Sequence, residues 1–126
     1  MLINERTGVI VATQVEVADT RASRRKGLLG RDSLDPSAAI VLSPCFAVHT
    51  AFMRFPIDVL FVNRNGVVVR VARDVGAWRM TASWRAHAVI EAAAGTATRQ
   101  DVRVGDRLYV ASESAHGRAI SWPVPA

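Results

Sequence analysis

His49, Arg54 and Asp58 fall within ten consecutive positions of a stretch that is otherwise rich in apolar and aromatic residues. An imidazole titrates near neutral pH and can serve as a general base. A guanidinium binds carboxylate and phosphate groups, and a carboxylate can orient a base or hold a guanidinium in place. These residue types make the stretch the first candidate for a ligand-binding or catalytic site.

The role of His49 depends on what lies above it. Strand alternation puts His49 on one face with Ala47 and Ala51, whose small side chains leave room beside the imidazole. If Trp78 or Trp84 fills that room, His49 is a packed and hydrogen-bonded core residue. We expect this packed arrangement, and a pocket over His49 is the functional alternative.

The neighbouring charges also have a structural and a functional interpretation. Arg54 and Asp58 flank Pro56 and are predicted to form an ion pair that fixes the turn, although a guanidinium beside a pocket would also bind an anion. Glu91 lies in a run of Val, Ile and Ala, where an acid must be exposed, paired or functional. We expect Glu91 to pair with a base such as Arg85 or Arg54.

Cys45 is the only cysteine, which excludes an internal disulfide. Cys45 and His49 would share a strand face, but their α-carbons would be about 13 Å apart on a straight strand. One zinc ion needs ligand atoms roughly 2.0–2.3 Å away, so we expect no metal site, no cofactor and no essential thiol. The sequence also lacks a phosphate-cradling glycine loop and a Ser-His-Asp signature.

The size and composition of the chain narrow its class. The 126 residues fit one domain, and half of them are hydrophobic. No apolar run approaches the roughly 20 residues of a membrane span, and the N-terminus does not resemble a secretory signal, so a cytoplasmic protein is expected. The net charge of +5 is scattered and no nucleic-acid-reading motif is present. We therefore expect a small polar ligand or a protein partner, without nucleic acid or membrane, and a monomer or weak dimer.

Short strands separated by turn signals dominate the pattern. One short helix is predicted from Thr20, which can cap it, to about Leu29, with Gly30 as its stop. Residues 76–86 are predicted to form a loop with aromatic anchors, and Gly95–Val102 one helical turn. The strands are expected at 8–18 (one strand or a bent pair), 39–42, 46–53, 57–62, 67–71, 87–93 and 107–111.

A central hairpin is the sharpest local prediction. Ile57–Val62 and Val67–Val71 flank Asn65-Gly66, a pair that tolerates the positive φ of a type I′ turn. In the second arm Val67, Val69 and Val71 are expected to face the core. Phe52, Phe61, Val69 and Ile90 are expected to be buried.

These elements predict a mainly β fold, a sandwich or jelly-roll-like barrel with one short helix. Residues 1–111 would form the single β-rich domain. Residues 112–126 are rich in Ser, Gly and Pro and are expected to be a flexible C-terminal tail.

Three motifs carry a family resemblance: Thr20-x3-Arg24-x2-Gly27-Leu28-Leu29-Gly30-Arg31-x2-Leu34; His49-Thr50-x2-Met53-x2-Pro56-Ile57-Asp58 through Gly66-Val67-Val68; and Ala88-Val89-Ile90-Glu91-x3-Gly95 followed by Val104-Gly105-Asp106. Together they resemble the domain of unknown function 192 family. The resemblance implies a mainly β sandwich or jelly-roll-like core and no known reaction, cofactor or catalytic residue. His49 stands where exported bacterial members have tryptophan, so the chain resembles the shorter, cytoplasmic branch.

Two functions follow from these residues. The first is a non-catalytic module that binds a small ligand or a partner through a surface whose candidate residues are His49, Arg54, Asp58, Trp78, Arg79 and Glu91. The alternative is a hydrolase- or lyase-type enzyme with His49 as general base and Glu91 or Asp58 as the orienting carboxylate. That alternative requires contact between imidazole and carboxylate at roughly 2.6–3.2 Å.

Overall fold

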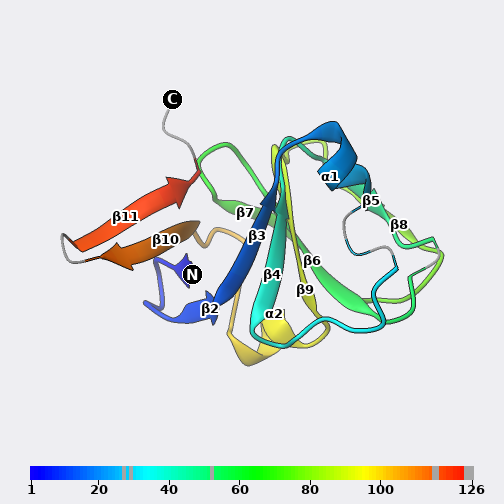
Figure 1. Cartoon of the computed structure of the whole chain (residues 1–126), viewed down its shortest axis with the longest axis horizontal. Coiled ribbons are helices and arrows are strands. Elements are labelled where there is room, and N and C mark those ends of the chain that lie inside the picture. Colours follow the sequence, from blue (N-terminus) through cyan, green and yellow to red (C-terminus); the bar gives the residue numbers. More distant parts are fainter. Residues whose placement is uncertain (27, 29, 52, 115–116, 124–126) are drawn as a thin grey trace.

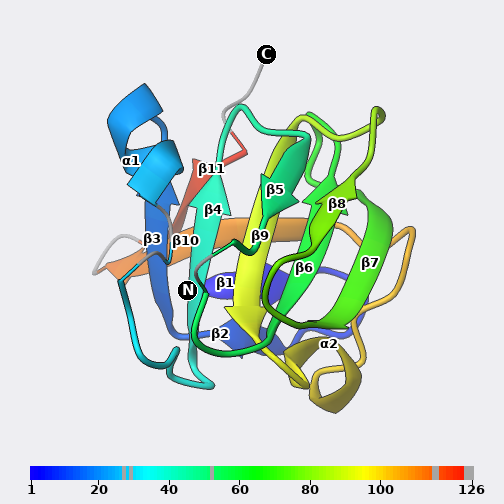
Figure 2. The ribbon, with the colours of Figure 1, turned by 90° about the vertical axis from the view of Figure 1, so that its right-hand side faces the viewer.

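Two strands at the centre of the molecule are apolar on both faces. They are β6 (Ile57–Val62) and β9 (Ala88–Ala93), and nearly all of their residues are buried. A strand with two apolar faces requires a covering layer on each side. The computed structural model describes residues 1–26, 28, 30–51, 53–114 and 117–123, and within these residues the chain supplies both layers (Figures 1 and 2).

The central sheet contains β6 and β9 together with three further strands, in the order β3-β4-β9-β6-β7. The additional strands are β3 (Gln14–Ala18), β4 (Ala38–Leu42) and β7 (Val68–Val75). β3 and β4 run parallel and the other neighbours are antiparallel.

One covering layer, the outer sheet, has the order β11-β10-β1-β2. Its strands are β1 (Leu2–Asn4), β2 (Ile10–Ala12), β10 (Leu108–Ser114) and β11 (Gly117–Trp122). The expected flexible tail is therefore wrong for residues 112–114 and 117–122, which pair as a hairpin that anchors Trp122 in the core. The pattern at 8–18 is a bent pair, since β2 belongs to the outer sheet and β3 to the central sheet.

The other face of the central sheet is covered by a small ribbon and by loops. The ribbon consists of β5 (Ala47–His49) and β8 (Met80–Ala82), which pair antiparallel. Figure 2 shows it in front of β9 and β6, and Figure 1 shows it on the side opposite the outer sheet. β8 lies within the segment that was expected to be a loop, and the strand expected at 46–53 is shorter than predicted.

Short helices close the layers at their ends. α1 (Arg21–Lys26) is capped as predicted, because the Thr20 hydroxyl accepts the Ser23 N–H at 3.1 Å. α2 (Thr96–Arg99) is the helical turn expected after Gly95. Among the described residues, no helix has the length and apolar character needed to cross a membrane.

The core has two parts, one on each face of the central sheet. Ile90 is fully buried toward the outer sheet, whereas Phe61 is fully buried toward the ribbon. Both burials were predicted. Val69 is only half-buried against the Phe61 side, and Phe52 lies outside the described residues.

The predicted hairpin of β6 and β7 is present, but its turn differs from type I′. Only Gly66 has positive φ, at 81°, and the Asn63 side chain accepts the Asn65 and Val67 N–H groups. A bulge between Phe61 and Val62 shifts the register. Val68 is consequently a fully buried residue of the second arm, in place of the predicted set that began at Val67.

We predict that Phe61→Ala lowers the free energy of unfolding by about 3–5 kcal/mol, through lost apolar transfer and the cavity left behind. Phe61 has no exposed surface, so the loss should fall at the high end of large-to-small substitutions. Equilibrium denaturation in urea measures the change. A midpoint equal to that of the native chain would contradict the assignment of Phe61 to the core.

Candidate functional site

Asp58 is part of the scaffold. Its carboxylate is buried and accepts the Asp74 N–H at 2.9 Å and the Ala97 N–H at 2.8 Å. The two bonds tie β6 to the end of β7 and to the first turn of α2. The predicted pair with Arg54 is therefore wrong, because a buried carboxylate here takes backbone donors.

Arg54 instead pairs with Asp32. Both side chains are exposed, so the pair contributes little to stability, on the order of 0–1 kcal/mol. It links the segment after α1 to the segment between β5 and β6. This position keeps Arg54 away from both carboxylates that the sequence suggested as its partners.

Glu91 is a buried acid in an apolar layer. Its side chain follows Val89 on the ribbon-facing side of β9, and its neighbours across the strands are Ile40 and Val59. Only 6% of Glu91 is exposed, and no hydrogen bond or ion pair joins its carboxyl group to any residue that the structure describes. The expected pairing with Arg85 or Arg54 is thus wrong. Burial raises the pKa of Glu91 to about 7.

His49 faces away from the core. It pairs with Met80 across the ribbon and is exposed, whereas Val48 and Thr81, the next pair, turn inward. The packed histidine expected from the sequence is wrong, because the ribbon presents this face to solvent. Among the described residues, His49 contacts neither Glu91 nor Asp58 through a hydrogen bond or ion pair.

Large apolar side chains are exposed on the ribbon and in the segments that adjoin it. Trp78, Met80 and Trp84 are 67%, 77% and 89% exposed, and Phe46 beside them is 60% exposed. Met80 lies on β8 beside buried Thr81, and Trp78 and Trp84 lie in the turns before and after that strand. Phe46 precedes β5, and its carbonyl accepts the Ser83 N–H at 2.9 Å. We call these four residues the aromatic ridge.

A hydroxyl network sets the position of the ridge. The Thr50 side chain is buried, accepts the Arg79 N–H at 2.8 Å and donates to the Gly76 carbonyl at 2.6 Å. The Trp78 N–H donates to the Thr50 carbonyl at 3.1 Å, and Trp78 has a φ of 60°. A non-glycine residue with positive φ persists only where its surroundings fix it. His49, Trp78 and Arg79 are thereby brought together at one end of the ribbon.

Positive charge accompanies the ridge. Arg79 lies between Trp78 and Met80, Arg85 follows Trp84, and both arginine residues are exposed. Of the predicted site residues, the hydrogen bonds around Thr50 thus gather His49, Trp78 and Arg79, whereas no hydrogen bond or ion pair among the described residues joins Arg54, Asp58 or Glu91 to these three. Met80, Trp84 and Phe46 were not among the predicted site residues, although Met80 and Trp84 lie in the segment that was expected to carry aromatic anchors.

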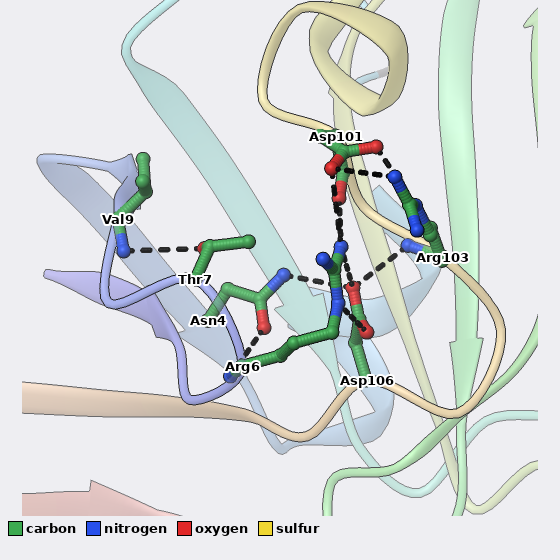
Figure 3. Close-up of polar contacts among 7 residues, drawn as sticks. All are labelled: Asn4, Arg6, Thr7, Val9, Asp101, Arg103 and Asp106. Atoms are coloured by element: carbon green, nitrogen blue, oxygen red, sulfur yellow. Dashed lines mark hydrogen bonds and ion pairs between the residues drawn. The ribbon is translucent and has the colours of Figure 1, made fainter.

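A separate polar network joins the segment after β1 to the segment between α2 and β10 (Figure 3). Arg6 binds both carboxylate oxygens of Asp106, with Nε–Oδ1 at 2.6 Å and Nη2–Oδ2 at 3.1 Å. Asn4 and the Arg103 N–H each donate to Asp106 at 2.8 Å. Burial alone would raise the pKa of Asp106, but the bonds from Arg6, Arg103 and Asn4 outweigh it and lower the pKa to about 2. The polar groups of this cluster are hydrogen-bonded to one another, which is typical of a network that stabilises the fold.

The structure offers no grouped metal ligands in the part of the chain it describes: no three His, Cys, Asp or Glu side chains lie close enough together to hold an ion. Cys45 is half-buried, and its thiol donates to the Ala47 carbonyl at 3.2 Å.

Comparisons with known proteins agree with this mainly β architecture. The DUF192 family, described as "Uncharacterized ACR", matches residues 2–110, so the chain belongs to that family. A "putative transcription regulator" from Sinorhizobium meliloti 1021 is similar, with 25% identity over 75% of this chain and 78% of that one and a TM-score of 0.69. A protein of unknown function from Novosphingobium aromaticivorans DSM 12444 gives the same identity and TM-score over 76% and 74%. None of the curated proteins matches the chain.

Glu91 makes stability depend on pH near neutrality. Between its ordinary pKa of 4.5 and about 7, the folded protein holds a proton that the unfolded chain releases. The free energy of unfolding should therefore fall as pH rises through this window, by about 3 kcal/mol in total. Denaturation at pH 5 and pH 8 should show Glu91→Gln with a flatter pH dependence and greater stability at pH 8. An unchanged pH slope in the variant would refute the assignment.

Asp106 makes the stability of the fold depend on pH in the acidic range. Its pKa of about 2 lies below the ordinary 3.8, so its contribution is present above about pH 4 and is lost as pH falls through 2. The contribution amounts to about 2 kcal/mol. Acid titration followed by circular dichroism should show Asp106→Asn less stable at pH 6 and less sensitive between pH 4 and pH 2. Equal acid midpoints for the two proteins would contradict the network's role.

Proposed function

We propose that this DUF192 protein is a binding domain for an extended peptide segment of a partner protein. The aromatic ridge, with Arg79 and Arg85, forms the docking surface. The observation that carries the proposal is the exposure of four large apolar side chains, Met80 on β8 and Phe46, Trp78 and Trp84 in the segments that adjoin the ribbon, each 60–89% exposed. Large apolar side chains gathered on one surface of a soluble domain mark interaction sites.

The composition of the surface favours a protein partner. Tryptophan, phenylalanine, methionine and arginine are the residue types enriched in protein–protein interfaces. Tryptophan and arginine are also the commonest binding hot spots. Because a two-ring side chain has few rotatable bonds, Trp84 can be immobilised by a partner at a modest cost in entropy.

The ribbon also suggests an extended partner. β5 and β8 form a two-stranded sheet, so within the described part of the chain each has one edge that pairs with no further strand. Arg70 donates to the Ala82 carbonyl at 2.7 Å and occupies part of the β8 edge. The β5 edge at His49 is then the place where a peptide backbone can add hydrogen bonds while its side chains meet the ridge.

The charges specify the peptide further. Arg79 and Arg85 are exposed and adjoin ridge residues in the sequence, so we expect apolar side chains flanked by Asp or Glu in the bound segment. We do not extend the proposal to catalysis. His49 is exposed on the outer face of the ribbon. Glu91 is buried on the face of the central sheet that the ribbon covers, and the Asp58 carboxylate accepts hydrogen bonds from backbone amides.

A displayed library of random peptides tests the proposal. Peptides with apolar residues beside Asp or Glu should be enriched, and a selected peptide should bind at least tenfold more weakly to Met80→Ala/Trp84→Ala. Val104→Ala removes an exposed apolar side chain outside the ridge and is the control. Because these side chains are exposed, all variants should melt near the native temperature.

Several results would count against a peptide site. Enrichment that is indifferent to acidic residues, or equal loss of binding in Val104→Ala, would contradict the docking surface. Ridge-dependent binding to anionic vesicles or to single-stranded oligonucleotides, without any selected peptide, would replace the peptide by another partner class. Concentration-dependent dimerisation that disappears in Met80→Ala/Trp84→Ala would assign the ridge to a second copy.

A further inference from the structure

A second concave surface lies away from the ridge. It is a pocket of about 840 Å³ between the β6–β7 turn, the hairpin of β10 and β11, and the start of β9. No ridge residue lines it. This volume lies within the range of small-molecule sites, roughly 300–1,000 Å³. The pocket is therefore formed by different elements from those of the peptide surface.

Close packing of the turn on β10 builds the pocket. The Leu108 N–H donates to the Gly66 carbonyl at 2.9 Å, and the Arg107 Nε donates to the Asn65 carbonyl at 3.2 Å. A Cβ at Gly66 would lie 2.4 Å from the Leu108 carbonyl oxygen, so only glycine permits this approach. The contact holds Arg64, in the turn, and Arg107, beside β10, at one pocket.

Positive charge in the pocket is only partly neutralised. Arg107 forms a 3.6 Å pair with Glu5, another lining residue, and both side chains are exposed. Arg64 has no hydrogen bond or ion pair with any residue in the described part of the chain. A guanidinium with unused donors beside a cavity is suited to a carboxylate or a phosphate.

His87 supplies a neutral polar group beside these charges. Burial, and then the positive charge of Arg64, lower the pKa of His87 below its ordinary 6.5. At neutral pH its imidazole is uncharged, so it can donate one hydrogen bond and accept another. The backbone of His87 is fixed on both sides, since its N–H donates to Val62 and its carbonyl accepts from Cys45, each at 2.8 Å.

The opposite wall is apolar and aromatic. Tyr109, Ile120 and Trp122 line it, and Ile120 is 58% exposed although it lies on a strand of the outer sheet. Trp122 belongs to the core and is nearly buried, so it forms a rigid part of the wall. The Tyr109 hydroxyl accepts a bond from Arg118 at 3.2 Å. Flat rings favour stacked or edge contacts with walls of this kind.

We propose that this pocket binds a small aromatic anion, a planar ring system that carries a carboxylate or phosphate group. Arg64 and Arg107 hold the anionic group, His87 orients the polar edge of the ring, and Tyr109, Ile120 and Trp122 hold its apolar face. The site is independent of the peptide surface, so the two proposals stand or fall separately.

Matched ligand pairs test the charge requirement. Calorimetric titrations would compare 2-naphthoate with neutral 2-naphthamide, and adenosine monophosphate with adenosine. At least one anion should bind tenfold or more tightly than its neutral partner, and the pair that does so identifies the carboxylate or the phosphate as the group. Acetate and inorganic phosphate, which lack the ring, should bind more weakly than that anion.

Paired arginine variants locate the binding. Arg64→Met keeps the apolar stem, removes the charge and should weaken the preferred anion about tenfold. Arg73→Met makes the same change at an exposed arginine of β7 outside the pocket and should have no effect. Chemical-shift changes should centre on His87 and the Trp122 indole. Equal binding of anion and neutral analogue, no binding by either anion, equal affinity in Arg64→Met, or shifts confined to the ridge would overturn the proposal.

Discussion

The burial of β6 and β9 on both faces is the constraint on which the remaining structure depends. Both strands supply apolar side chains to two separate core regions. Neither face of such a sheet can be left to solvent, since burying apolar surface is the dominant favourable term in folding. The outer sheet covers one face, and the ribbon with its adjoining loops covers the other.

Both proposed binding surfaces belong to these covering layers. The ridge lies on and beside the ribbon, whose inner residues Val48 and Thr81 turn toward the central sheet. The aromatic anion pocket lies at the rim of the outer sheet, where the β6–β7 turn meets β10. A rigid interior with recognition on its covers lets binding residues vary without loss of the core.

Two buried carboxyl groups, those of Asp58 and Glu91, differ in their hydrogen-bond partners. Asp58 accepts two backbone N–H groups and fixes β6 to its neighbours. Glu91 has no described partner, and burial alone raises its pKa to about 7. The Thr81 hydroxyl on the inner face of the ribbon is also buried without a hydrogen-bond partner among the described residues. These two unpaired groups are local weak points of the ribbon-side layer, because each loses hydration without a compensating bond.

Sequence patterns predicted the elements that are set by local chemistry. The Thr20 cap, the hairpin around Asn65-Gly66 and the burial of Phe61 and Ile90 follow from short-range signals and apolar runs. The sequence patterns did not predict features that depend on a partner distant in the sequence. Alternation around His49 identified two faces but could not show which face the ribbon turns outward, and the partners of Asp58 are backbone amides with no sequence signature. Residues 117–122 were misjudged because Ser, Gly and Pro outweighed the alternation that pairs them with β10.

We propose that ligands bind at two separate surfaces, one on each layer that covers the central sheet. The three tryptophans allow a single measurement to test this proposal. Trp78 and Trp84 lie on the ridge and Trp122 lines the pocket. Fluorine NMR of protein labelled with 5-fluorotryptophan would follow all three during titration with a selected acidic peptide and then with the preferred aromatic anion. We expect the peptide to shift the Trp78 and Trp84 resonances and the anion to shift only the Trp122 resonance. A peptide that moves Trp122, or an anion that moves the ridge tryptophans instead, would contradict it.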